Sequence, residues 1–69
     1  MDYVFTFDLP TEQKSFRVKL YRTLKRMQAE QVQRSIWKSS NLRELTRLAV
    51  LVKNVGGSAR ITEEKLIFQ

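Results

Sequence analysis

A short run of aromatic and β-branched residues near the start of the chain does most to limit its fold. Five of the six residues in Tyr3–Asp8 favour β-strand structure, and Val4 alternates with the aromatic residues around it. Because both sides of such a strand are apolar, we expect it to lie at the centre of a sheet. Pro10 lacks the N–H group that a sheet ladder needs, so the strand must end before it.

Asp8 lies at the carboxyl end of this predicted strand. Loops at strand ends often carry functional side chains, and a carboxylate there is a candidate metal ligand or catalytic group. Asp also commonly accepts backbone N–H bonds in turns. The sequence leaves both roles open for Asp8, one functional and one structural.

The chain contains neither Cys nor His, which restricts its chemistry. Ser-His-Asp triads, Cys nucleophiles and His-ligated zinc are excluded. Any catalysis would have to come from carboxylates, hydroxyls, Lys, Arg or a hard metal ion such as Mg²⁺. No apolar run of about 18 residues and no cleavable signal is present, so we expect a cytoplasmic protein without a membrane span.

Sixty-nine residues predict a single domain, 1–69. A chain of this size buries only about 60 per cent of its unfolded surface, so a monomer would have marginal stability. Disulfides and structural zinc, the usual supplements to a small core, need residues that this chain lacks. We therefore expect a homodimer.

Positive charge is concentrated in the middle of the chain. Between Lys14 and Lys53 there are eleven Lys or Arg residues and two acids, within a formal net charge of +6. Such a segment is typical of proteins that bind polyanions. The alternative is an ordinary solvated surface whose charge only keeps the protein soluble.

A first helix is predicted after Thr11, a plausible N-cap, with Glu12 in its first turn. Apolar residues recur at helical spacing and would pack on the sheet, while basic residues cover the remaining surface. The apolar residues are Phe16, Leu20, Leu24 and Met27, flanked by Val18 and Tyr21.

The segment 29–39 predicts one bent strand or two short strands that meet near Arg34 and Ser35. We favour two strands because the polar pair shifts the apolar phase between Val32 and Ile36. Trp37 is expected in the core, although a Trp near basic residues can also stack on nucleic-acid bases.

Asn41 and Glu44 form an N-cap and capping-box pattern that predicts the start of a second helix. Its apolar face comprises Leu42, Leu45, Leu48, Ala49 and Val52, and Gly56-Gly57 would end it. The glycine pair has no phosphate-loop spacing around it.

A last strand is predicted over 59–68, with a break at Glu63-Glu64 and Leu66, Ile67 and Phe68 beyond it, as an edge strand or a strand that spans a dimer. The predicted order is thus strand, helix, two short strands, helix, strand. With both helices on one face of an antiparallel sheet, this is the ferredoxin-like βαββαβ sandwich of the α+β class.

Short motifs in this order resemble those of the second-family CRISPR-associated proteins. They are Phe7-Asp8-Leu9, the basic helix, and Val32–Trp37, in which Gln33, Ser35 and Trp37 match the family pattern. The Trp-containing version is also similar to the Cas-like domain of phenylacetate-pathway repressors.

The resemblance implies a homodimer that binds double-stranded DNA or RNA and bridges CRISPR integrase dimers during antiviral defence. It also implies that Asp8 from each subunit binds Mg²⁺ in members with endonuclease or endoribonuclease activity, and that Arg17 lies near the nucleic acid.

Three functions follow from the residues and the resemblance. The first is a sequence-tolerant nucleic-acid-binding adaptor. The second is a Mg²⁺-dependent nuclease with Asp8 as catalytic residue and metal ligand. The third is a non-catalytic dimerisation or interaction module of a regulator. In the first, the phosphate-contacting residues are Arg17, Arg22, Arg26, Arg34, Lys38 and Arg43.

Overall fold

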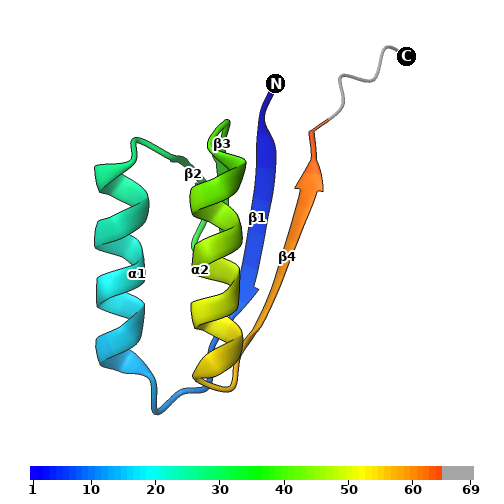
Figure 1. Cartoon of the computed structure of the whole chain (residues 1–69). Helices are drawn as coiled ribbons and strands as arrows, with labels where there is room; N and C mark the ends of the chain where they lie inside the picture. The colour runs from blue at the N-terminus through cyan, green and yellow to red at the C-terminus, as the bar shows by residue number, and fades with distance from the viewer. Residues whose placement is uncertain (65–69) are drawn as a thin grey trace.

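The computed structural model describes residues 1–64 and has the element order βαββαβ (Figure 1). This confirms the ferredoxin-like prediction, with two short strands between the helices. The elements in chain order are β1 (Tyr3–Asp8), α1 (Lys14–Arg26), β2 (Glu30–Gln33), β3 (Ile36–Ser39), α2 (Leu42–Asn54) and β4 (Ser58–Glu63).

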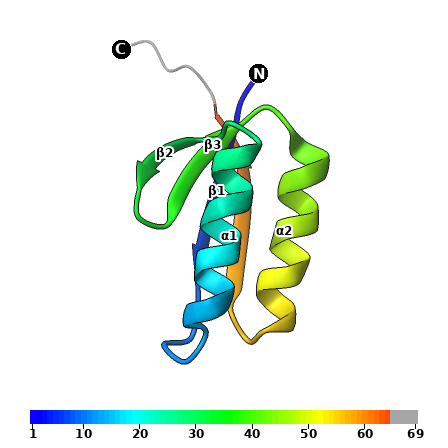
Figure 2. The same cartoon turned by 90° about the vertical axis from the view of Figure 1, so that its left-hand side faces the viewer.

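The four strands form one antiparallel sheet in the order β2-β3-β1-β4, so the aromatic strand β1 is central, as predicted. Phe5 is the register partner of Trp37 on one side and of Ile61 on the other. The register of β2 against β3 shifts between Gln31 and Gln33. Both helices cover the same face of the sheet, as the two perpendicular views show (Figures 1 and 2).

The core lies between that face and the helices. Alternation along β1 directs Phe5 and Phe7 into it, and the helical spacing of the leucines adds one stripe from each helix. Trp37 is buried, as expected, with its ring centroid 5.8 Å from that of Tyr21. The buried apolar residues are Phe5, Phe7, Leu9, Leu20, Leu24, Trp37, Leu45, Leu48 and Val52.

The predicted start of the first helix is wrong. The N-cap of α1 is Gln13 rather than Thr11, and Glu12 precedes the helix instead of lying in its first turn. The Gln13 N–H donates to the Pro10 carbonyl at 3.0 Å. This closes a turn that has Thr11 and Glu12 at its centre, so neither residue can cap the helix.

The second helix begins as predicted, but only half of the capping box forms. The Asn41 side-chain oxygen accepts a hydrogen bond from the Glu44 N–H at 3.1 Å. The reciprocal bond is replaced, because the Asn41 N–H donates to the Ser39 hydroxyl at 3.0 Å and the Glu44 carboxylate binds Arg47.

The glycine pair ends α2 and starts the return strand. Gly56 has a φ of +90°, a left-handed conformation that suits glycine. At Gly57, a Cβ atom would collide with the backbone oxygen of Asp8, so the chain entering β4 approaches the end of β1 more closely than other residues allow. β4 is an edge strand that ends at Glu63; Leu66, Ile67 and Phe68 of the predicted strand lie outside the described residues.

The second face of the sheet carries no helix. Val4, Thr6 and Asp8 of β1 lie on this open face, since they alternate with the buried aromatic residues. Val4 is half-buried while Thr6 and Asp8 are exposed, so the apolar character of β1 is concentrated on the helix side. Neither helix among residues 1–64 has the length and apolar character needed to cross a membrane.

Candidate nucleic-acid interface

The fold sorts the charges of the chain into two regions. The helices carry nine cationic side chains, six in α1 and three in α2, against a single acid, Glu44. The remaining described residues carry three cations and six acids. The cause is the amphipathic pattern of each helix, because the apolar stripe faces the sheet and the basic residues face solvent.

We call the solvent side of α1 and α2 the basic helix layer. Its cations are Lys14, Arg17, Lys19, Arg22, Lys25, Arg26, Arg43, Arg47 and Lys53.

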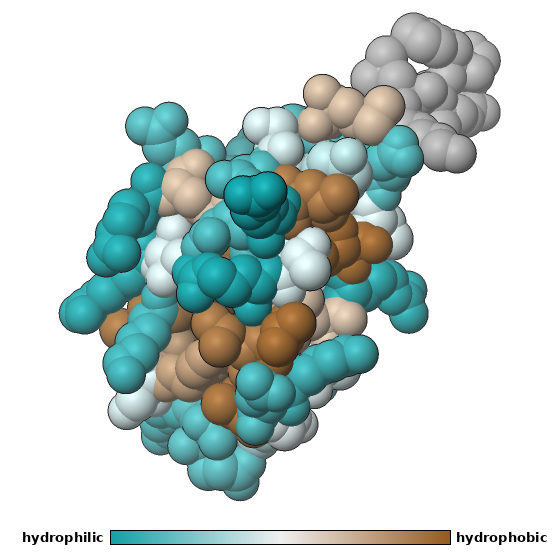
Figure 3. Space-filling model, in the orientation of Figure 1, coloured by the Kyte–Doolittle hydropathy of each residue, from teal (hydrophilic) through white to brown (hydrophobic). Residues whose placement is uncertain are grey.

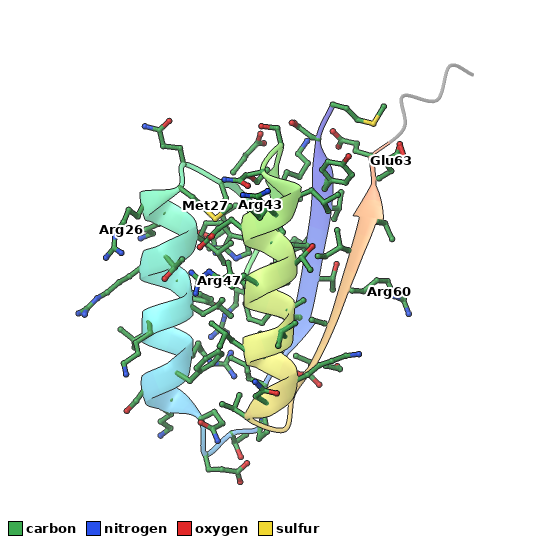
Figure 4. The ribbon with its side chains drawn as sticks, in the orientation of Figure 1. Arg26, Met27, Arg43, Arg47, Arg60 and Glu63 are labelled. Atoms are coloured by element: carbon green, nitrogen blue, oxygen red, sulfur yellow. The ribbon has the colours of Figure 1, made fainter. Side chains whose placement is uncertain are left out.

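Four of the six predicted phosphate-binding residues lie in this layer. Arg22 and Arg26 of α1 and Arg43 of α2 are exposed, and Arg17 is half-buried. The order of the strands makes the two helices antiparallel, which brings Arg26 and Arg43 to the same end of the layer (Figure 4). Lys19 and Arg47 are not among the six predicted residues. Lys19 lies four residues before Thr23 and three after Phe16, and Arg47 lies four before Leu51, so helical spacing could have placed both beside the apolar stripe.

Arg34 lies at the side of the layer. It is in the turn between β2 and β3, and its backbone carbonyl accepts a hydrogen bond from the Tyr21 hydroxyl of α1 at 2.8 Å. This bond ties the hairpin to the helix. The exposed Arg34 side chain therefore extends the basic surface beyond α1.

Lys38 lies on the opposite side of the molecule, on the open face of the sheet. Its ammonium group is 3.0 Å from the Glu64 carboxylate, and Glu30 is its register partner on β2. The hydrogen bond to Glu64, followed by the charge of Glu30, raises the pKa of Lys38 above its usual value. The structure thus separates Lys38 from the other predicted cations and surrounds it with acids.

The residues of the second motif build the sheet. Trp37 is buried, and the backbone carbonyl of Ser35 accepts a hydrogen bond from the Phe7 N–H at 3.1 Å. Gln33 is exposed on the edge strand β2 and pairs with Ile36. Trp37 is consequently closed to base stacking, the second role considered for it.

Asp8 ends β1 on the open face and is exposed. Its register partner is Ser58. Two shallow hollows meet at Asp8, one of about 320 Å³ toward Arg60 and one of about 250 Å³ toward Gly57. Within residues 1–64 the Asp8 carboxylate accepts no hydrogen bond from a side chain or a backbone N–H. The turn that follows is closed instead by the Gln13 N–H and the Pro10 carbonyl. The structural role in the turn is therefore not realised.

A single chain offers a metal ion little at this position. No group of three or more Asp, Glu, His or Cys side chains with the geometry of a metal site occurs in the described part of the chain. Mg²⁺ is bound through one or two carboxylates together with waters and substrate oxygens. One Asp8 alone does not make such a site, so a second carboxylate would have to come from another chain.

Glu44 is the only acid in the basic helix layer, and its charge is used within the layer. Arg47 donates from Nε to both carboxylate oxygens at 3.2 Å and forms an ion pair through Nη2. This hydrogen bonding lowers the pKa of Glu44 and raises the pKa of Arg47. The Arg47 side chain is still 56 per cent exposed, so it keeps donors directed toward solvent.

No protein-family model matches the chain, and a search of curated proteins finds no significant relative. The chain is therefore classified by its fold, the ferredoxin-like sandwich. Because one fold serves many unrelated activities, its function has to be argued from its surfaces.

Proposed function

We propose that this chain is a sequence-tolerant nucleic-acid-binding protein that contacts the phosphate backbone through its basic helix layer. The observation that carries the proposal is the gathering of nine cations and one acid on two adjacent helices. Lys and Arg on such a surface neutralise phosphates and release counterions, which supplies affinity without reading the base sequence.

The burial of aromatic side chains favours duplex over single-stranded nucleic acid. Proteins that bind single strands stack bases on accessible aromatic rings. Among residues 1–64, Phe5, Phe7 and Trp37 are buried, and the other aromatic side chains are half-buried. The basic helix layer thus offers charge without a stacking platform, and a duplex presents its phosphates without requiring one.

We also propose that the protein forms a homodimer. Its small core and its resemblance to the second-family CRISPR-associated proteins support this. A two-fold axis would present two basic helix layers to one ligand. Under that resemblance, the dimer serves as an adaptor between CRISPR integrase dimers. The resemblance to repressor domains supports the other option, an interaction module of a regulator.

A Mg²⁺-dependent nuclease is the second candidate, and one observation favours it. The Asp8 carboxylate is exposed and accepts no hydrogen bond within residues 1–64, which leaves its oxygens available to a metal ion. The candidate requires a dimer that brings two Asp8 side chains together, since one chain supplies a single carboxylate there.

The test is a binding titration of the purified protein with short double-stranded DNA and RNA across a salt series, with Mg²⁺ present and the products run on a denaturing gel. Binding that weakens steeply with salt and leaves the substrate intact is the expected result. Cleavage that needs Mg²⁺ and disappears in Asp8→Asn would put the nuclease first. Absence of binding to either duplex at low salt would refute both and leave the interaction module.

A further inference from the structure

The basic helix layer contains an apolar groove between α1 and α2. The groove has a volume of about 200 Å³ and opens to solvent between the two helices. Apolar side chains are visible at the surface there, with hydrophilic side chains on either side (Figure 3). The lining residues are Phe16, Lys19, Leu20, Thr23, Arg47, Leu48 and Leu51.

The floor and the rims of the groove differ in chemistry. Leu20 and Leu48 are the buried part of the floor, whereas Lys19 on α1 and Arg47 on α2 are exposed at opposite rims. The Thr23 hydroxyl donates to the Lys19 carbonyl within α1 at 3.0 Å, so its donor is already used. The groove therefore combines an apolar floor with a cation on each side.

We propose that this groove is a docking site for an acidic amphipathic helix of a partner protein. Apolar side chains from one face of that helix fill the floor. Flanking Asp or Glu side chains pair with Lys19 and with the donors of Arg47 that its ion pair with Glu44 leaves toward solvent. This is the helix-in-groove mode of recognition, in which anchors at i, i+3 and i+4 enter an apolar channel. Arg43, one helical turn from Arg47 and on the same side of α2, extends the cationic rim (Figure 4).

The size and charge of the groove select this occupant over others. Small-molecule pockets typically measure about 300–1,000 Å³, whereas this groove is smaller and open. A phosphate backbone would satisfy the rims but has no apolar side chain to cover the floor. A helix that is both acidic and apolar satisfies both parts.

Docking of such a helix does not require that the chain bind nucleic acid, so the inference goes beyond the proposed function. The two ligands nevertheless share the cations of the basic helix layer. We therefore expect them to compete, with the acidic helix displacing a bound duplex.

The probe is a fluorescent synthetic peptide of about 14 residues, near the length at which isolated helices become stable, with Leu on one face and Glu elsewhere. Binding is measured by anisotropy at low salt, with a scrambled peptide of the same composition as control. Leu51→Glu places a charge in the groove wall and is expected to weaken binding by about tenfold or more, as loss of an apolar anchor does. The matched control is Val18→Glu, an equal charge change at a residue that is 49 per cent exposed and outside the groove lining.

A second variant pair guards against misfolding of Leu51→Glu. Arg47→Gln removes a rim cation from an exposed side chain, and Arg60→Gln makes the same change on β4, away from the helices (Figure 4). Weaker peptide binding in Arg47→Gln with wild-type binding in Arg60→Gln supports the proposal. Equal losses in each pair, equal binding of the scrambled peptide, or no binding would overturn it. Self-association that Leu51→Glu abolishes, without peptide binding, would assign the groove to a second copy instead.

The outcomes separate this inference from the proposed function. Duplex binding without peptide binding refutes the docking site and leaves the proposed function intact. Peptide binding without duplex binding supports the docking site and refutes the proposed function.

Discussion

The Tyr21 hydroxyl of α1 donates a hydrogen bond of 2.8 Å to the backbone carbonyl of Arg34, 13 residues later in the turn between β2 and β3. The two residues lie in elements that share no backbone ladder, so this side-chain bond adds a polar link between the helix and the hairpin. It also holds the turn that contains Arg34 against α1, beside the basic helix layer.

Tyr21→Phe should therefore lower the free energy of unfolding by about 0.5–1.5 kcal/mol, the net worth of one such hydrogen bond. Urea denaturation followed by circular dichroism measures the change. Tyr3→Phe is the control, since the Tyr3 hydroxyl has no hydrogen-bond partner among residues 1–64 and its loss should matter less. Equal effects of the two substitutions would contradict a specific role for the Arg34 contact.

Gly57→Ala should be more destabilising than Gly56→Ala. A Cβ at Gly57 would collide with the Asp8 carbonyl and press on Val52, and overpacking of this kind costs about 1–3 kcal/mol. At Gly56 the new atom would meet only the Pro10 ring, at 3.6 Å, so the cost is mainly that of a left-handed conformation, about 1–2 kcal/mol. Denaturant titrations of both variants test the order, and the reverse order would show that β4 does not need this close approach.

Removal of two cations from the basic helix layer should change how duplex binding responds to salt. If Arg22 and Arg26 each contact a phosphate, the double variant Arg22→Gln/Arg26→Gln should reduce the slope of log K against log salt by about 0.9 for each contact. Arg60→Gln, which removes a cation from β4, should leave the slope unchanged. A slope that is equally insensitive to both changes would move the interface away from α1.

Asp8→Asn separates the two candidate functions. In the adaptor, duplex binding should stay at the wild-type level or rise, because a negative charge is removed and no hydrogen bond within the described residues is lost. In the nuclease, Mg²⁺-dependent cleavage should disappear while binding persists. Binding and cleavage are read from the same reaction by native and denaturing gels, with Glu12→Gln as a charge-matched control. Cleavage that survives in Asp8→Asn would exclude Asp8 as the metal ligand.

The Glu44–Arg47 pair should contribute to stability in a pH-dependent way. Because Arg47 lowers the pKa of Glu44 in the folded state, the contribution is fully present above the unfolded value of about 4.5 and is lost as the pH falls through the folded value. The stability difference between the wild type and Arg47→Gln should consequently shrink below about pH 4.5. Arg43→Gln, which removes a charge one turn earlier, should show no such shrinkage. A pH-independent difference would mean that Arg47 stabilises α2 by other means.

The order of elements could be predicted because local chemistry and tertiary structure agree in most of the chain. Alternation in β1, helical spacing of the leucines and the Asn41 cap each specify one element without outside help. The start of α1 could not, since Thr11 and Glu12 have good capping chemistry. Both residues lie instead in the turn that the Pro10 carbonyl and the Gln13 N–H close. Whether such a turn forms depends on how β1 is connected to the helix.

The candidate site was less accessible from sequence than the fold. The composition gives the number of cationic residues but not the face of the molecule on which each one lies. Lys38 lies on the open face because it alternates with the buried Trp37, and the pairing of β2 with β3 then places it opposite Glu30. The groove between Lys19 and Arg47 forms only where α1 and α2 pack side by side. It therefore could not be predicted from the local sequence of either helix.

The separation of charge between the helices and the rest of the molecule has a consequence for how the protein meets a ligand. With nine cations on the helices and an excess of acids elsewhere in the described chain, the protein carries a permanent electric dipole across its two layers. Near a polyanion, the electric field of the polyanion exerts a torque on that dipole and turns the helices toward the polyanion before contact. The uncovered sheet, with Asp8 at its rim, would then point away from the polyanion and stay accessible to another protein.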